Sequence, residues 1–332
     1  MLQFQKTIAT SQMTLPIVGV LAAVVWILLP QPANMSVGLP DFCDAEYGLW
    51  QLIPHFLTEG LFSLGIALSC AAFTVYLMAE LNNTHVLLRI SSRLLSSMLA
   101  MLMTFCMILH TFQPGSIAAI FILLSFFPLF HSYQLPHPTL SFTTFLLISL
   151  ASLVFTKILL LVPIYWFIQA YIRALSFRCF VASILAILLP YWIYGGIALF
   201  TDSLPFFLEH VTSLIQFSLY DYTQLTINNI LPFAFLTILF AVGTIDFYRN
   251  NFLDKTRTRI LYNVVIMHGA AILLFICLQP QYFTTMLPLF IIDVSIVYGH
   301  FAALTYNRFS HILCIVLTIA ALAIMASEYF II

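Results

Sequence analysis

The hydrophobic stretches of this 332-residue chain alternate with short polar gaps, and ten of its eleven Lys and Arg residues lie in those gaps. Apolar residues make up 62% of the chain and charged residues only 7%, whereas a soluble domain carries about 25% charged residues. A chain of this composition cannot cover a surface that faces water. The pattern therefore predicts an all-α, polytopic integral membrane protein whose main partner is the lipid bilayer.

Eleven apolar runs predict membrane spans, most of them 17 to 22 residues long. That length matches a hydrocarbon core of ~30 Å at ~1.5 Å per residue. We find no internal repeat, linker or soluble domain, and we expect a single transmembrane helical domain over 1–332. The predicted spans are 14–30, 60–80, 94–112, 116–134, 139–156, 158–173, 179–200, 229–248, 260–278, 286–304 and 310–327.

Positive charge orients these spans, because Lys and Arg remain on the cytoplasmic side of a membrane. If Lys6 is cytoplasmic, the gaps after the second, sixth, eighth and tenth spans are cytoplasmic too. Those gaps hold Arg89, Arg93, Arg173, Arg178, Arg249, Lys255, Arg257, Arg259 and Arg308. We therefore predict a cytoplasmic N-terminus and an outer C-terminus.

The stretch 139–173 is apolar except for Lys157. A single helix of that length would extend ~52 Å, well beyond the hydrocarbon core. It would also place Arg173 and the later cytoplasmic cluster on the opposite side from Arg89. We favour two spans that meet near Thr156 and Lys157, although one span remains the alternative.

Two outer segments, 31–58 and 201–228, are longer than simple turns. In 204–220, polar residues recur at helical spacing and apolar residues fill the opposite face. This pattern predicts an amphipathic helix lying in the outer interface. Segment 41–58 shows a similar pattern, and its Tyr47 and Trp50 suit the headgroup level.

The predicted outer face is acidic, and Lys157 is its one basic residue. Exclusion of positive charge explains the missing Lys and Arg, but it does not explain why Asp41, Asp44 and Glu46 crowd together. The cluster fits either solvated loop acids or a binding or catalytic site. The outer acids are Asp41, Asp44, Glu46, Glu59, Asp202, Glu209, Asp221 and Glu328.

Two further ionisable residues are candidates. Lys157 either faces a cavity and a partner or extends its ammonium group to the interface. Asp293 lies inside the tenth span, where a carboxyl serves as an ion or proton site or bonds to a neighbouring helix. No acid lies one helical turn from it, which favours the structural interpretation. No His-x-x-His spacing predicts a metal cage, and no basic cluster predicts nucleic-acid binding.

Several segments resemble the GT-C class of membrane glycosyltransferases, which use polyprenyl-phosphate-linked sugars. Asp44–Tyr47 is similar to the acidic motif of that class in the first outer loop, although Ala45 interrupts the acidic pair. Ser92–Ser97 is similar to the start of its third span, and Leu150–Lys157 to a pattern ending in Thr-Lys. Pro280–Tyr282, followed by Met286–Leu289, is similar to an Arg-Tyr-x-x-Pro motif, with Gln281 where the class has Arg.

This resemblance implies an enzyme that acts on a lipid-linked sugar at the outer face. Asp44 would deprotonate the acceptor, and Glu46 would hold the acceptor or a divalent cation such as Mg²⁺ or Mn²⁺. Lys157 would neutralise the donor phosphate. The candidate substrate-binding residues are Lys157, His55, His210, Asp41 and Tyr47.

Two other functions stay open. Asp293 and the proline-interrupted spans suit a transporter or flippase, and short loops suit a non-catalytic subunit of a membrane complex with other membrane proteins. The chain also resembles a family of bacterial polytopic membrane proteins with no assigned activity. That likeness implies a bacterial inner membrane location.

Overall fold

The computed structural model describes residues 11, 13–29, 49–58, 60–90, 92–217, 227–305 and 308–330. All regular structure within these ranges is helical, without a strand, which confirms the predicted all-α class. Asp41, Asp44, Glu46 and Tyr47 lie outside the described residues, as do Lys6, Glu59 and Asp221.

Each predicted span is occupied by helix. Two of the eleven consist of an α-helix joined to a short 3₁₀ helix, at Met107–His110 (η4) and Thr156–Leu161 (η5). The α-helices are α2 (Thr14–Leu28), α4 (Gly60–His85), α5 (Leu94–Phe105), α6 (Pro114–His131), α7 (Pro138–Val154), α8 (Val162–Tyr171), α9 (Phe177–Phe200), α11 (Ile227–Asn250), α12 (Thr256–Leu278), α13 (Phe283–Leu304) and α14 (Arg308–Phe330).

Six of these helices are long and apolar enough to cross a membrane: α4, α6, α9, α11, α12 and α13. The other predicted spans correspond to shorter apolar helices by the same measure. The chain thus has the build of a multi-pass membrane protein. Eleven crossings, and the side on which each end lies, stay predictions.

The stretch 139–173 is two helices rather than one. Phe155 is extended, with φ −140° and ψ 99°, and it separates α7 from η5 and α8. Gln169, late in α8, donates to the hydroxyl of Ser141, early in α7, over 3.0 Å. The chain therefore reverses direction at Phe155. Because a 3₁₀ helix rises ~2 Å per residue, η5 lengthens the second arm of this hairpin.

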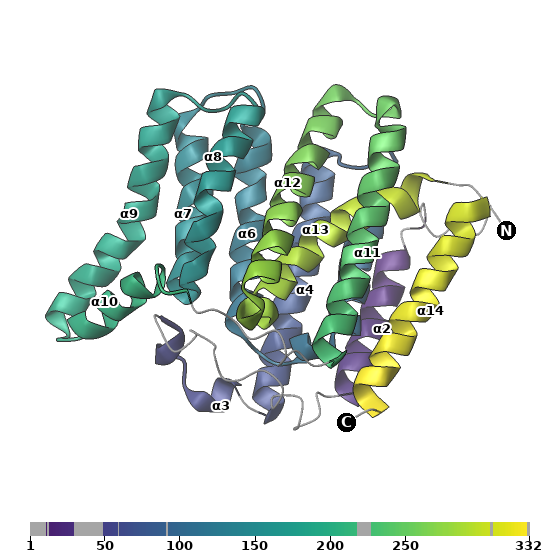
Figure 1. The fold of residues 1–332 in the computed structure, drawn as a ribbon, viewed down its shortest axis with the longest axis horizontal. Helices are drawn as coiled ribbons and strands as arrows, with labels where there is room; N and C mark the ends of the chain where they lie inside the picture. The colour runs from purple at the N-terminus through teal and green to yellow at the C-terminus, as the bar shows by residue number, and fades with distance from the viewer. Residues whose placement is uncertain are drawn as a thin grey trace.

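Successive helices run in alternating directions across the molecule (Figure 1). In this view the connections after α6, α8 and α11 lie at the upper edge, and those after α9 and α12 lie lower down. Arg173 and Lys255 lie in the connections after α8 and α11, and Arg249 lies in the last turn of α11.

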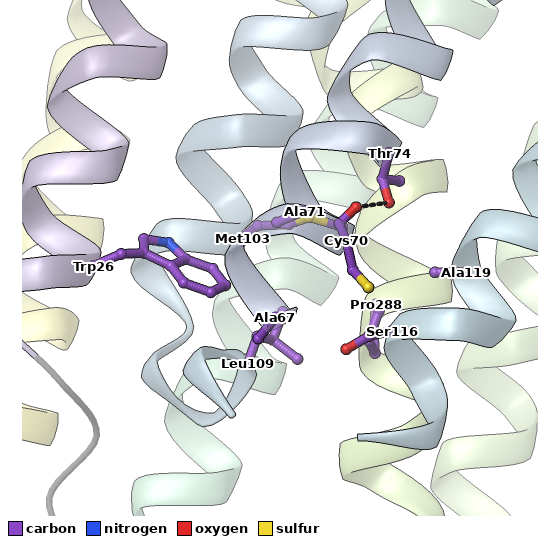
Figure 2. Close-up of a pocket in the computed structure, with 10 residues that line it drawn as sticks. All are labelled: Trp26, Ala67, Cys70, Ala71, Thr74, Met103, Leu109, Ser116, Ala119 and Pro288. Carbon is purple, nitrogen blue, oxygen red and sulfur yellow. Dashed lines mark hydrogen bonds between the residues drawn. The ribbon is translucent and has the colours of Figure 1, made fainter. Parts of the chain in front are cut away.

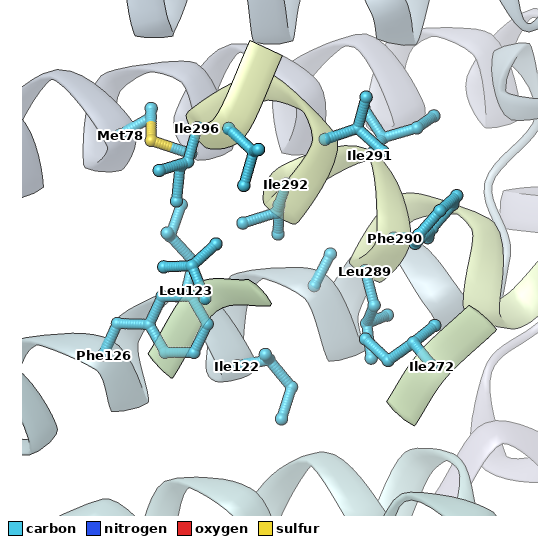
Figure 3. Packing of buried hydrophobic residues seen from close by; sticks show 14 of the residues in the cluster. Met78, Ile122, Leu123, Phe126, Ile272, Leu289, Phe290, Ile291, Ile292 and Ile296 are labelled. Carbon is cyan, nitrogen blue, oxygen red and sulfur yellow. The ribbon is translucent and has the colours of Figure 1, made fainter. Parts of the chain in front are cut away.

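Helix α13 forms the centre of the bundle, where it packs against α5, α6, α11 and α12. Within its most apolar window, 94% of the residues are buried. A helix that is apolar on all sides is stable only when other helices surround it. Figure 3 shows its apolar side chains, including Leu289, Phe290 and Ile292, interleaved with Met78, Ile122 and Phe126 of neighbouring helices.

Glycines allow two neighbours to approach α13 closely. A Cβ on Gly243 of α11 would lie 2.9 Å from the backbone nitrogen of Tyr298. A Cβ on Gly269 of α12 would lie 3.0 Å from the Cβ of Asp293. Small residues at helix contacts provide this close packing where apolar burial between helices drives little association.

The outer segments differ from the sequence prediction in length. Helix α10 covers Leu204–Ser213 instead of 204–220, and residues 218–220 lie beyond the described part. In place of a continuous helix over 41–58, the described residues form two short pieces, η3 (Leu49–Leu52) and α3 (His55–Thr58). Pro54 separates these pieces because proline disfavours helical backbone at the residue before it.

Candidate functional site

Lys157 is the centre of a polar cluster at the lower end of the bundle, in η5. Its side chain is buried, and its ammonium group donates to the carbonyls of Ser213 and Gln216, each over 2.5 Å. The ammonium also lies 4.7 Å from the ring centroid of Phe217. Carbonyls at a helix C-terminus attract cations, so Lys157 stabilises the end of α10. The contact lies at the point where α10 ends, at Ser213.

His210 lies beside Lys157, as part of the same cluster. Its Nδ1 is 3.0 Å from the hydroxyl of Thr156, the residue that precedes Lys157. The imidazole is buried and stacks on Tyr191, with ring centroids 5.8 Å apart. Of the predicted substrate-binding residues, Lys157 and His210 are thus brought together by α10 and η5.

The same cluster joins two segments that are far apart in the sequence. The Lys157 ammonium lies 5.4 Å from the ring centroid of Tyr282, in η8 (Pro280–Tyr282). Phe155 reinforces this contact, with its ring centroid 5.6 Å from that of Tyr282. The segments that end at Lys157 and begin at Pro280 therefore meet at one end of the bundle.

Among the described residues, none of the other predicted site residues joins the cluster of Lys157 and His210. Asp41, Asp44, Glu46 and Tyr47 are outside the described residues, and of His55 only the backbone, in α3, is described. Asp202 and Glu209 are exposed. Ser92–Ser97 starts α5 at the opposite end of the molecule, so that similar segment takes no part in the cluster.

Asp293 is not isolated inside the bundle. Its Oδ2 lies 2.8 Å from Nδ1 of His268 on α12, and Nε2 of His268 lies 3.3 Å from the hydroxyl of Tyr165 on α8. The Tyr165 hydroxyl is 3.2 Å from that of Ser125 on α6. Four helices thus contribute to one buried polar chain.

The sequence prediction did not find this chain, although it placed both His268 and Asp293 within spans. No spacing rule could pair them, since helix packing alone brings α12 and α13 into contact at these residues. The one sequence signal was the presence of two ionisable residues inside apolar runs, which usually find partners in the bundle.

A third polar cluster lies near the start of α12, at the predicted cytoplasmic end. Buried Asp254 pairs with Arg89 over 2.8 Å, between Oδ1 and Nε, and its Oδ2 lies 3.0 Å from Nε2 of His300. The rings of Tyr262 and His300 make a T-shaped contact, with centroids 4.6 Å apart. This cluster connects the α4–α5 connection with α12 and α13.

A small cavity of about 20 Å³ lies beside α4, lined by residues that include Trp26, Cys70 and Pro288 (Figure 2). Such a volume holds about one water molecule. The hydroxyl of Thr74, on its wall, donates to the carbonyl of Cys70 over 2.7 Å. Its lining is mostly apolar, with the Cys70 thiol as its one ionisable group among the described residues.

Among the described residues, no group of three His, Cys, Asp or Glu side chains converges to hold a metal ion. The predicted ligands of a divalent cation, Asp44 and Glu46, are not among those residues. The Mg²⁺ or Mn²⁺ hypothesis therefore keeps its sequence basis alone.

Comparisons of this chain with known protein families, with curated proteins and with solved structures find no match.

Proposed function

We propose that this multi-pass membrane protein is a transferase that acts on a lipid-linked sugar at its outer face. The observation that carries the proposal is the contact between Lys157 and Tyr282. These residues belong to separate segments that are similar to motifs of one class of membrane glycosyltransferases. Their convergence at the predicted outer end supports a common role.

In the proposed reaction Asp44 accepts the proton of an acceptor hydroxyl. The hydroxyl oxygen forms a bond to the anomeric carbon as the bond from that carbon to the donor phosphate breaks. The polyprenyl phosphate then leaves with the electron pair. Glu46 holds the acceptor or a divalent cation, and His55, Asp41 and Tyr47 contact the substrate.

Lys157 takes a positioning role in this proposal. Because its ammonium already donates to two carbonyls, it holds the outer segment 214–217 in place. Its fixed positive charge also offsets part of the repulsion between the outer acids and a phosphate. His210 supports the same arrangement through Thr156.

The test is sugar transfer by the full chain in proteoliposomes, with polyprenyl-phosphate-linked hexoses and aminosugars as donors. Asp44→Asn and Glu46→Gln should each lower transfer by about 100-fold or more, the usual share of a general base. Asp202→Asn, which changes an exposed outer acid, is the matched control. Undiminished transfer in both variants, or no transfer by the wild type from any donor, would refute the proposal.

A second candidate is a proton-coupled transporter, which the buried pair of His268 and Asp293 favours. Ionisable residues inside a bundle commonly mark proton or ion pathways. Uptake into vesicles driven by a proton gradient should be lost in Asp293→Asn. Uptake that persists in this variant would exclude the candidate.

A further inference from the structure

The polar chain inside the bundle consists of four successive contacts. They run from Asp293 Oδ2 to His268 Nδ1, from His268 Nε2 to the Tyr165 hydroxyl, and from there to Ser125. The Ser125 hydroxyl finally donates to the carbonyl of Ile122 over 2.7 Å. All four side chains are fully buried. Every contact in such a chain needs one proton between its two heavy atoms.

The number of protons depends on the charge of the pair. An ionised Asp293 with a neutral His268 leaves one imidazole N–H and the two hydroxyl protons, which serve three of the four contacts. One additional proton, shared by His268 and Asp293, supplies the fourth contact. The protons then point in one direction: from the pair through His268 Nε2 to Tyr165, from Tyr165 to Ser125, and from Ser125 to Ile122.

Burial also favours the state in which His268 and Asp293 hold the additional proton. Oδ1 of Asp293 is buried and accepts no hydrogen bond, an arrangement that is costly for a carboxylate oxygen. The surroundings of the pair are apolar. The ring of Phe126, from α6, contacts His268, and the ring of Phe240, from α11, lies against Gly269. The titratable groups that face one another here are Tyr165, His268 and Asp293. None of them supplies a compensating positive charge unless His268 is protonated.

We propose that His268 and Asp293 form a proton-binding site that holds one proton more than the aspartate–imidazole state and is electrically neutral. The proton comes from a hydronium ion of the solvent: one O–H bond of that ion breaks and leaves water, and an O–H bond on Asp293 or an N–H bond on His268 forms. The inference depends on these contacts and on neither proposed function.

The site retains its proton in this conformation. At one end the chain of contacts finishes on the carbonyl of Ile122. In the other direction along α13, the next polar cluster begins at His300. This residue is two helical turns from Asp293, roughly 10 Å along the axis, and the apolar residues Ile296 and Val297 are buried between them. A proton could leave only if the packing around α13 changed.

Two spectroscopic measurements on the full chain in nanodiscs, at about pH 8, test the proposal, because exposed carboxyls are then ionised. Infrared spectra with carbon-13 aspartate report a protonated carboxyl. Nitrogen-15 histidine spectra, with His268→Gln for assignment, report whether one or both nitrogens of His268 carry protons. We expect either a protonated aspartate band that Asp293→Asn removes or a doubly protonated His268.

Asp246→Asn is the control, since Asp246 also accepts hydrogen bonds, from Asn250 and Thr305, but lies at the end of α11. It should leave both spectra unchanged. An ionised aspartate population with a single proton on His268 would overturn the proposal. Should Asp293→Asn fail to fold, isotope labelling of the wild type still decides between the two states.

Discussion

At the scale of single residues, the structure explains how an apolar bundle accommodates charge. The ammonium of Lys157 is buried against two carbonyls and two aromatic rings. Asp254 is buried against Arg89 and His300. Each charged group thus has partners that replace water, which is the condition for its burial.

Lys157→Met should destabilise the predicted outer end of the bundle by about 3 kcal/mol, because hydrogen bonds to charged groups contribute about 1.5–3 kcal/mol each. Methionine fills similar space but leaves the carbonyls of Ser213 and Gln216 without this donor. Protease cleavage within 214–217 should become markedly faster. Lys255→Met, at an exposed position, is the control. Equal cleavage rates in the two variants would contradict the anchoring role of Lys157.

Val86 has a left-handed backbone, with φ 50°, directly after the end of α4, and its side chain is 63% exposed. A β-branched residue is strained in this conformation, whereas glycine is not. Val86→Gly should therefore raise the free energy of unfolding by about 1 kcal/mol. Unfolding in mixed micelles measures the change. Val86→Ala keeps its Cβ and should gain less; an equal gain would argue against strain at this position.

At the scale of helices, apolar length and charge located the elements well, and the break at Phe155 falls next to the residues where two spans were expected to meet. Element ends were predicted less well. Helix α10 ends at Ser213, where Lys157, distant in sequence, donates to the carbonyls of Ser213 and Gln216. Sequence periodicity contains no information about such a contact.

Replacing a glycine by alanine should have opposite effects on stability in two helices. In Gly243→Ala the new methyl would meet the backbone of Val297 and Tyr298 at 2.9 Å, and overpacking of this kind costs about 1–3 kcal/mol. Gly196 on α9 has no atom within 4 Å of a new Cβ, so alanine there should stabilise by up to about 1 kcal/mol. Unfolding in mixed micelles compares both variants with the wild type. Changes of the same sign would contradict the close packing of α11 on α13.

At the scale of the whole molecule, the connections after α6, α8 and α11 lie at one edge (Figure 1), and the predicted orientation makes that edge cytoplasmic. A reporter that is active only outside the cytoplasm should be inactive when inserted after Lys255 and active after Asp202. A reporter active only in the cytoplasm should give the reverse pattern. Activity of the first reporter after Lys255 would invert the proposed sidedness and remove the outer-face site.

The sequence by itself determined the class of this protein, because so few charged residues cannot solvate a surface and apolar runs of this length must be helical in lipid. It also determined which residues are exceptional, among them Lys157 and Asp293. Only the tertiary structure decided their partners. Lys157 donates to the carbonyls of Ser213 and Gln216, and His268 meets Asp293, because helix packing brings together residues whose separation along the chain follows no local period.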